Sequence, residues 1–516
     1  MKTVLKVAGL NIRGHGNLNV HHPDNKWLGI WQILREQKIA VLVVGEAHMN
    51  QERKDNVSKI FGRKLRIEFT ENPRSPNAAG LAFVINKNLA RVDTIESLTV
   101  VPGRAMILKI QQADGSPLSI LGVYAPNNPA KNRQFWEDID KFFKDNPRTG
   151  RPDLMVGDTN VVEAAIDRLP AHEDDKNAVD ALDELKSKFT LVDGWRATYP
   201  DTRNYTFRQP HALGGALSRI DRIYVKTASF ENTFDWGIQR IGIETDHDLV
   251  WAKITTADAP TVGKGRWVWP AHIMKDRNLA EFILQSGLEL SAALEELKNN
   301  NNRTVENNAQ TLWTNFKTKI GVRARERTKE TAPKIIKEIA ELELKLANVS
   351  RDKVMSEEER HLNTAMIIDQ IAKLQKQRYK SNRLTAQIQN RLHGEIIGRY
   401  WTKINKPSKP RDTIHRLKKP APPGVTDAPV EYETNSKRMA NMTQEYHDHL
   451  QGDRQDTSEQ EREAKIERVL ARTQIHITDE QNEKLKAKMM LEDVSQALKS
   501  SANFKAPGLD GIPYEL

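Results

Sequence analysis

The stretch TDHDLVWAKI, residues 245–254, joins an Asp-His-Asp triplet directly to an apolar run. A short apolar run of this kind is typical of a buried strand, so the triplet lies where a strand begins. A solvated turn before the strand explains a single triplet equally well. Matching polar groups at the ends of other strands would instead favour a functional site.

The first 257 residues alternate apolar runs with helical patterns. The runs are rich in Val, Ile and Leu, and most end at Gly, Asn, Pro or Asp, which predicts strands. Between them, WLGIWQILREQ and NRQFWEDIDKFFKD carry apolar residues at three- and four-residue spacing, which predicts helices. We therefore expect one large α/β domain with enough strands for two sheets. The strand candidates are VLKVAGLNI, IAVLVVGEA, AGLAFVINK, MILKIQQ, PLSILGVYA, DLMVGDTN, SRIDRIYVK and DLVWAKI.

Beyond residue 257 the composition changes. Leu, Ile, Lys, Glu and Gln dominate and strand signals are few, which predicts long amphipathic helices with a polar break near NNNNR. The stretch KPSKPRDTIHRLKKPAPPG is rich in proline, as linkers are. We expect a linker at 258–275, a helical basic connector at 276–405, a Pro-rich linker at 406–430, a helical segment at 431–500 and a final segment at 501–516.

Charge and composition narrow the class of protein. The net charge of +10 is concentrated in residues 264–419, which hold 32 Lys and Arg against 18 Asp and Glu. Such a basic segment indicates a polyanionic partner. The chain has no cysteine, which excludes disulfides and thiolate metal sites. No run of 18 apolar residues and no signal-peptide pattern is present, so we expect an intracellular protein, nuclear or cytoplasmic, with no membrane partner.

Polar residues recur at the ends of the predicted strands. Loops at strand ends are positioned by a rigid sheet, so ligands and catalysts gather there. Carboxylates, carboxamides and an imidazole together suit phosphodiester hydrolysis, since Mg²⁺ takes carboxylate oxygens and a His held by an Asp can assist proton transfer. We expect Mg²⁺, with Mn²⁺ as an alternative. The residues are Asn11, Glu46, Tyr124, Asp158, Asn160, Asp221, Asp246 and His247.

The ordered motifs LNIRG, VVGEA, GVYAPN, GDTN, SRIDRIYV and TDHDLV resemble the endonuclease/exonuclease/phosphatase family. That family includes apurinic/apyrimidinic endonucleases and deoxyribonuclease I-like enzymes. The resemblance spans about residues 4–257 and implies a four-layered sandwich of two β-sheets flanked by helices. Each motif alone is weak, and the series of six in order carries the resemblance.

The resemblance also implies a role for each residue. Glu46 would bind the metal, Asn11 would support it and Asp246 would lie near it. Asp158 would orient the attacking water. The remaining implied roles are contact with phosphate by Asn160, His247 and Tyr124, and orientation of His247 by Asp221. Whether Asp158 or His247 is the general base stays open, as does the alternative that Asp221 only pairs with the neighbouring Arg219 and Arg222.

Two departures from the family pattern refine the comparison. Abasic-site repair enzymes typically have an Asp two residues after the strand-end Asn, where this chain has Arg13. Deoxyribonuclease I-like members have a His where this chain has Tyr124. The first departure argues against a dedicated repair enzyme, and the second favours the apurinic/apyrimidinic endonuclease branch or its relatives.

The last residues, FKAPGLDGIPYEL, resemble the segment that opens the reverse transcriptase domain of LINE-type non-LTR retrotransposons. The stretch GKGRWVWP is similar to a Gly-x-Gly-x-Trp connector of the same proteins. The resemblance implies the endonuclease portion of such a polyprotein, truncated at the start of the reverse transcriptase domain. No polymerase activity is expected from this chain.

Two stretches are candidate nucleic-acid contacts. Residues 371–419 hold 14 Lys and Arg against 2 Asp and Glu, with aromatic residues interleaved, so they could neutralise phosphates and stack on bases of target DNA or element RNA. The alternative is a solvated helix face. Residues 198–217 are expected to approach the DNA groove, although a plain surface hairpin explains them as well. The side chains concerned are Tyr379, Tyr400 and Trp401 in the first stretch, and Arg203, Tyr205 and Arg208 in the second.

These observations favour a Mg²⁺-dependent endonuclease that nicks double-stranded target DNA. In the family that it resembles, the resulting 3′-hydroxyl primes reverse transcription. Two alternatives remain: a phosphodiesterase of the same fold acting on phospholipid, and a non-catalytic nucleic-acid-binding remnant of a decayed element.

Overall fold

A computed structural model describes most of the chain, in two compact units. The first unit is Met1–Val262 with Lys334–Ser436, and the second is Gly263–Pro333 with Lys437–Leu516. None of the described helices is long and apolar enough to span a bilayer. The described residues are 4–17, 19, 22, 24–73, 80–112, 114–209, 215–256, 259, 267–270, 273–300, 303–331, 333–352, 354–393 (side chains only to 382), 406, 410, 414–420, 430–452, 458–472, 477–501 and 510–512.

Two six-stranded β-sheets form the centre of the first unit. In the first sheet only β1 and β2 pair in parallel, and in the second only β7 and β8 do. The first sheet has the order β14 (Thr233–Gln239), β15 (Leu249–Ile254), β1 (Leu5–Asn11), β2 (Val41–Gly45), β4 (Leu81–Asn86) and β3 (Leu65–Thr70). The second has the order β10 (Leu191–Asp193), β13 (Asp221–Lys226), β8 (Leu154–Asp158), β7 (Pro117–Tyr124), β6 (Ala105–Gln111) and β5 (Glu96–Val101).

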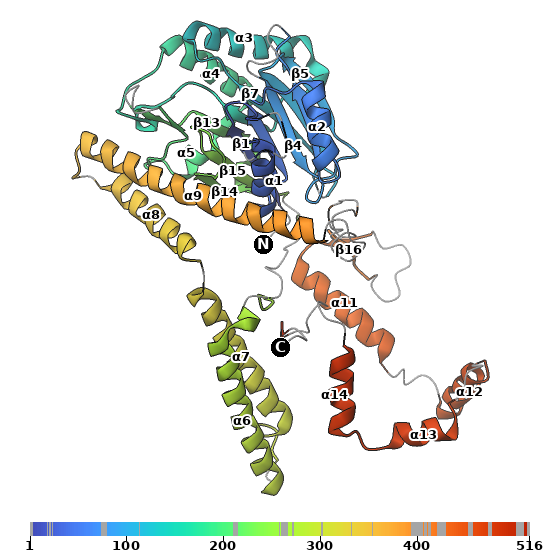
Figure 1. The fold of residues 1–516 in the computed structure, drawn as a ribbon. Coiled ribbons are helices and arrows are strands. Elements are labelled where there is room, and N and C mark those ends of the chain that lie inside the picture. The colour runs from blue at the N-terminus through green and yellow to red at the C-terminus, as the bar shows by residue number, and fades with distance from the viewer. Residues whose placement is uncertain are drawn as a thin grey trace. The chain divides into compact units, whose positions relative to one another are not determined.

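The sheets pack face to face and helices cover their outer faces (Figure 1). Apolar side chains of both sheets, such as Val43 and Val156, share one core between them. On the first sheet, α1 (Lys26–Glu36) and α2 (Gln51–Phe61) bury Trp27 and Phe61. On the second, α3 (Pro129–Asp145) and α4 (Lys176–Phe189) bury Trp136 and Phe189. This order of helix, sheet, sheet and helix confirms the expected four-layered sandwich.

Every expected strand is present, but several real strands carry no clear sequence signal. β3 and β5 each lie at one end of a sheet. Most of β5, ESLTVV, is exposed, and β3, LRIEFT, has charged residues on its half-buried face. An edge strand needs only one covered face, so its composition is not that of a buried run. The remaining short elements of this domain are α5 (Gly194–Thr198), β9 (Arg168–Leu169), β11 (Phe207–Arg208) and β12 (Leu217–Ser218).

A helical hairpin also belongs to the first unit. It consists of α8 (Lys334–Arg351) and α9 (Glu357–His393), which pack together through Val349, Ile367 and Ile371 (Figure 1). The Tyr379 ring of α9 is buried with Ile241 and Ile243 against the first sheet's outer core. The expectation that Tyr379 stacks on a nucleic acid is therefore wrong, because the ring instead anchors the helix. Tyr400 and Trp401 lie outside the described residues.

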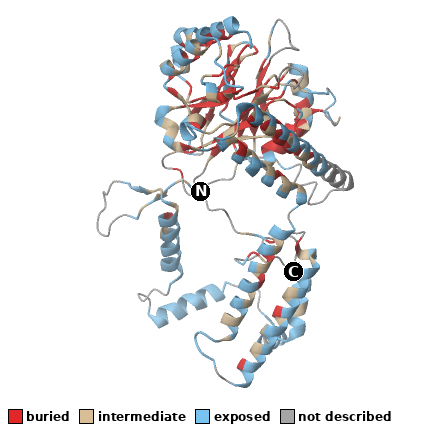
Figure 2. Ribbon diagram, turned by 90° about the vertical axis from the view of Figure 1, so that its left-hand side faces the viewer, coloured by how far each residue is buried: buried red, intermediate tan, exposed pale blue. Residues whose placement is uncertain are grey.

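The second unit has a small core of its own. Helices α6 (Arg277–Asn299) and α7 (Ala309–Glu330) enclose Trp269, Leu279 and Ile320, with Ile512 packed against them. Helix α6 ends at Asn299 and α7 begins at Ala309, so the helical region is interrupted near the Asn-rich stretch, as expected. Buried residues are concentrated in the strands of the first unit, whereas α12, α13 and α14 bury none (Figure 2). The remaining elements are β16 (Leu417–Lys418), β17 (Tyr432–Glu433), α11 (Ser436–Gln451), α12 (Glu459–Leu470), α13 (Asp479–Lys486) and α14 (Leu491–Ser500).

A buried ion-pair network fixes the start of β13. Arg219 donates to Asp167 at 2.7 Å and to Asp193 at 2.7 Å, and Arg222 donates to Asp193 at 2.9 Å. Arg222 also forms an ion pair with Glu163 at 2.8 Å. Although burial opposes the charge, hydrogen bonding from Arg219 holds the pKa of Asp167 below its usual value. Arg219 and Arg222 therefore pair with these carboxylates and not with Asp221, which lies between them in the sequence.

We predict that Asp167→Ala lowers the free energy of unfolding by about 3–5 kcal/mol, because it leaves two buried guanidinium groups without their shared carboxylate. Urea unfolding followed by circular dichroism measures this loss. The matched control is Asp183→Ala, whose ion pair with Lys186 is half exposed and whose removal costs less than about 1 kcal/mol. Equal losses in the two variants would contradict the structural role of the network.

Candidate functional site

The strand registers bring the predicted polar residues to one edge of the sandwich. In the second sheet, Asp158 at the end of β8 is paired with Tyr124 of parallel β7 and with Asp221 of antiparallel β13. In the first sheet, Asn11 at the end of β1 is paired with Gly45 of β2, which directly precedes Glu46. Because the carboxyl ends of parallel neighbours meet at the same edge, four of these residues emerge together.

Asn11 links the two sheets. Its Nδ2 donates to Glu46 Oε1 at 3.0 Å and to Asp158 Oδ2 at 3.1 Å. Its Oδ1 accepts from the backbone amide of Arg13 at 3.0 Å, so the orientation of the carboxamide is defined. The Tyr124 hydroxyl also donates to Glu46 Oε1, at 3.0 Å. One carboxamide therefore holds two carboxylates from different sheets next to each other.

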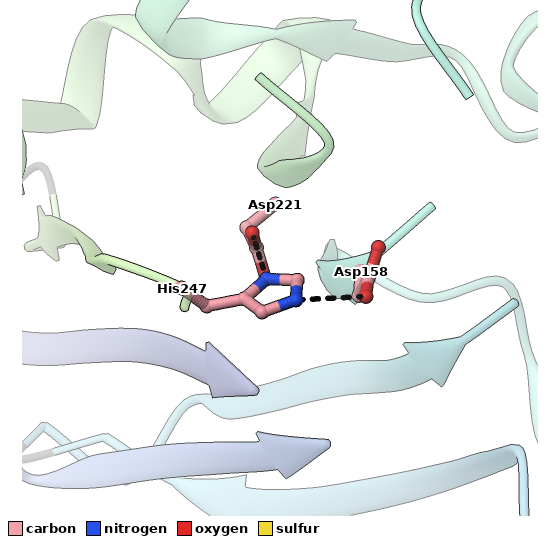
Figure 3. Close-up of side chains that lie close together, drawn as sticks. All are labelled: Asp158, Asp221 and His247. Atoms are coloured by element: carbon pink, nitrogen blue, oxygen red, sulfur yellow. Dashed lines mark hydrogen bonds and ion pairs between the residues drawn. The ribbon is translucent and has the colours of Figure 1, made fainter. Parts of the chain in front are cut away.

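His247 lies between the carboxylates of Asp221 and Asp158 (Figure 3), and Asp246 is also nearby. Its Nδ1 is 2.8 Å from Asp221 Oδ2. Its Nε2 is 4.0 Å from Asp158 Oδ2 and 4.0 Å from Asp246 Oδ1. The Nδ1–H group of His247 donates a hydrogen bond to Asp221, and Nε2 then faces Asp158. An aspartate commonly orients a functional histidine in this way.

Burial and mutual charge shift the proton affinities of this cluster. Burial, together with the negative charge of Asp221, raises the pKa of Asp158 to about 7. Burial lowers the pKa of His247, but the Asp221 carboxylate outweighs it and raises that pKa to about 9. Burial and the neighbouring Glu46 raise the pKa of Tyr124, so its phenol stays protonated. At neutral pH the imidazole is therefore a cation and a hydrogen-bond donor at both nitrogens.

Asn160 and Asp246 complete the rim of the site. The Asn160 backbone amide donates to Asp158 Oδ1 at 2.9 Å, and its Nδ2 donates to the carbonyl of Ala125 at 2.8 Å. Asp246 Oδ2 pairs with Arg13 at 3.3 Å, whereas Asp246 Oδ1 is buried and has no hydrogen-bond partner among the described residues. An unsatisfied buried carboxylate oxygen is costly unless a cation or a donor meets it.

The donor set suits a hard metal ion. Asp158, Asp221 and His247 are buried and place their ligand atoms within 4.8 Å of one another. In the observed arrangement, however, the His247 Nδ1 and Asp221 already bond to each other. The Oδ1 atom of Asp246 and the Oε2 atom of the half-buried Glu46 are the oxygens that remain for a cation, and oxygen donors are those that Mg²⁺ and Mn²⁺ prefer.

Three further candidates do not reach this cluster. Arg203 lines a cavity of about 590 Å³ between the domain and the α8–α9 hairpin. Tyr205 is buried in a small core with Leu169 and Leu217, so its ring does not face a substrate. Arg208 pairs with Asp369 of α9 at 3.4 Å, although its backbone amide does bond to the Asp246 carbonyl at 3.1 Å.

Sequence reasoning missed two threonines that support the site. Thr245 Oγ1 donates to the Asn11 carbonyl at 2.8 Å and ties the Asp-His-Asp triplet to β1. Thr206 Oγ1 accepts the backbone amide of Asp221 at 2.9 Å. Thr245 adjoins the triplet and could have been included with it, whereas nothing in the sequence distinguishes Thr206 from other loop threonines.

Comparisons with known proteins agree with this arrangement of motifs. Residues 10–247 match the sequence model of the Endonuclease/Exonuclease/phosphatase family. A Xenopus laevis protein named "Transposon TX1 uncharacterized 149 kDa protein" is 26% identical over 193 residues, or 37% of this chain. The chain spans only 14% of the length of that relative.

Several solved structures resemble the first domain at low sequence identity. The AP endonuclease LMAP from Leishmania major is 14% identical, with a TM-score of 0.42, and covers 49% of this chain and 88% of its own. The endonuclease domain of TRAS1, a telomere-specific non-LTR retrotransposon, is 13% identical, with a TM-score of 0.36. The match covers 49% of this chain and 99% of that domain. An AP endonuclease from Archaeoglobus fulgidus is 18% identical, with a TM-score of 0.38. The match covers 49% of this chain and 100% of that enzyme.

We predict that Asp158→Asn makes the fold more stable at pH 8 in chelator-treated, metal-free buffer, by on the order of 1 kcal/mol. The pKa of Asp158 is raised to about 7, so its charge opposes folding above that pH. The difference between the variant and the parent chain should shrink as the pH falls from about 7 and become smallest below about pH 3, where the carboxyl group is protonated in both the folded and the unfolded state. Urea midpoints at several pH values measure this, with the exposed Asp138→Asn as control. A variant less stable than the parent at pH 8 would contradict the repulsion inferred here.

Proposed function

We propose that this chain is a metal-dependent endonuclease that nicks double-stranded DNA and leaves a 3′-hydroxyl, in keeping with the match of residues 10–247 to the sequence model of the endonuclease/exonuclease/phosphatase family. The observation that carries this proposal is the bridge made by Asn11. Its Nδ2 is within 3.1 Å of carboxylates from both sheets, and His247 stands 4.0 Å from one of them. Groups from four strand ends can therefore act on one phosphate.

Glu46 and Asp246 are the residues that would hold the divalent cation, with Asn11 in support. The buried Oδ1 of Asp246, which accepts no hydrogen bond from a described residue, fits this role. When bound, such a cation neutralises charge on the phosphate and stabilises the departing oxygen. Mg²⁺ is the ion that we propose, and Mn²⁺ has the same ligand preference for oxygen.

The chain's own groups then act on the phosphate and the attacking water. Asp158 orients the water and takes its proton, because its raised pKa lies near neutrality and its orientation is fixed by Asn11 and Asn160. His247 donates from Nε2 to a phosphate oxygen and neutralises its growing charge. The new bond joins the water oxygen to phosphorus, and the bond from phosphorus to the 3′ oxygen breaks. The departing oxygen takes a proton from solvent water and becomes the 3′-hydroxyl, and Asp158 returns its proton to solvent.

The biological setting that we propose is a non-LTR retrotransposon. The curated relative is named as a transposon protein, and the end of this chain carries the sequence that resembles the opening of a reverse transcriptase domain. In such an element the 3′-hydroxyl left by the nick primes DNA synthesis on the element's RNA.

We expect wild-type protein to nick supercoiled plasmid in Mg²⁺, and Asp158→Ala and His247→Ala to lower the rate by about 10²–10⁴-fold each. Gel conversion of supercoiled to open-circular plasmid measures the rate. The exposed Asp183→Ala is the matched control and should keep the wild-type rate. Equal low background in all four proteins would indicate a non-catalytic remnant, and hydrolysis of a phosphoinositide instead of plasmid would indicate a phospholipid enzyme.

We also expect Mg²⁺ to raise the thermal unfolding midpoint of the first unit by about 2–8 °C at saturation, because a ligand that binds only the folded state stabilises it. Glu46→Gln should remove most of this rise, since a neutral amide is a poorer ligand than a carboxylate. The control is Glu184→Gln on the exposed surface of α4, which should retain it. A rise that persists in Glu46→Gln would place the cation elsewhere.

A further inference from the structure

Helix α9, which lies outside the family domain in the sequence, forms one wall of a cavity beside the candidate site. The cavity has a volume of about 570 Å³ and includes Asp246 and Arg13 at the rim of the site. On α9 the lining residues are Ala365, Asp369, Ala372, Lys373 and Lys376. Positions 365, 369, 372 and 376 recur at three- and four-residue spacing, so they form one face of the helix.

Specific contacts hold this face of α9 on the domain. His361 Nε2 is 2.7 Å from the carbonyl of Gly215, near the N-terminal end of the helix. Further along, Lys376 pairs with Glu244 at 3.2 Å and Arg378 with Glu36 at 3.3 Å. The buried Tyr379 ring adds an apolar anchor. Small residues of the helix face the cavity, so the helix is held in place while space remains beneath it.

The cavity is lined by more cations than anions. Arg13, Lys26, Arg208 and Arg240 come from the domain and Lys373 and Lys376 from α9, against Glu244, Asp246 and Asp369. Arg13, Arg208, Arg240 and Lys376 already pair with acidic groups. Lys373 is exposed and makes no hydrogen bond or ion pair with any residue that the structure describes. A free ammonium group at the rim of a cationic hollow is suited to a phosphate.

We propose that this cavity receives the phosphate backbone of the DNA strand next to the cleaved bond, and that Lys373 of α9 is one of its phosphate ligands. The inference rests on the proposed nuclease function and assigns part of its substrate surface to the helical hairpin. Backbone contacts of this kind position the substrate without reading its sequence. The hairpin thus extends the catalytic site along the DNA.

The first test compares full-length Lys373→Gln with wild type and with Lys345→Gln, an exposed lysine of α8 that does not line the cavity. Affinity for a duplex oligonucleotide is measured in chelator at several salt concentrations. We expect Lys373→Gln to bind about threefold to tenfold more weakly near 0.1 M salt, with a salt slope smaller by about 0.9. Lys345→Gln should match wild type. Unchanged or tighter binding by Lys373→Gln would overturn the inference.

A second test uses the absence of cysteine from the chain. A thiol-linked photocrosslinker on Ala372→Cys should react with bound duplex, whereas the same group on Lys345→Cys should not. Failure of Ala372→Cys to crosslink DNA that is bound would overturn the inference.

The nicking rate separates the two proposals. At DNA concentrations below saturation, Lys373→Gln should nick more slowly than wild type because it binds DNA more weakly, whereas Lys345→Gln should nick at the wild-type rate. A wild-type protein that binds DNA but never nicks would defeat the proposed function alone. A wild type that nicks, together with a Lys373→Gln variant that binds equally well, would defeat this inference alone.

Discussion

Two buried carboxylates that face each other across a strand pair are the constraint on which the rest of the site depends. The register of β8 and β13 places Asp158 directly opposite Asp221, and like charges in this position repel. Two hydrogen bonds offset that repulsion. The His247 imidazole bonds to Asp221, and the Asn11 carboxamide bonds to Asp158. A slip of β13 by one residue against β8 would turn Asp221 to the opposite face of the sheet and away from Asp158, so the sandwich and the site are specified together.

The α/β domain could be predicted largely from its sequence, because its central strands are buried on both faces and read as continuous apolar runs. The polar residues at their ends were predictable for the same reason, since each interrupts an apolar pattern. Asp221 shows the limit. Strand alternation directs Arg222 to the opposite face, but Arg219 precedes the strand, and only the structure shows that it bonds to Asp167 and Asp193. The choice between an ion pair and a histidine partner thus required coordinates.

Contacts between segments far apart in the sequence were not predictable. Tyr379 belongs to a basic helix and is surrounded in sequence by Lys, Arg and Gln, which gives no indication that it packs against Ile241 and Ile243. Tyr205 lies in a loop rich in Arg and Asn, yet its ring is in a small core. Helical periodicity defines which residues share a face, but it does not identify the surface that covers the face. Burial of these two aromatic rings is a tertiary property.

The distribution of charge explains what the α8–α9 hairpin can contribute to the binding of a DNA backbone. Residues 1–257 carry 35 Lys and Arg against 32 Asp and Glu, so the α/β domain is nearly neutral, and its candidate site is rich in carboxylates. A nearly neutral surface with an acidic centre attracts a DNA backbone weakly, since nonspecific affinity comes mainly from cations that displace condensed counterions. Docking α9 beside Asp246 brings lysines to the edge of that acidic centre without changing it. Under the proposed function, the carboxylates would be available to the metal and the water, while the lysines of α9 would supply affinity for the DNA backbone.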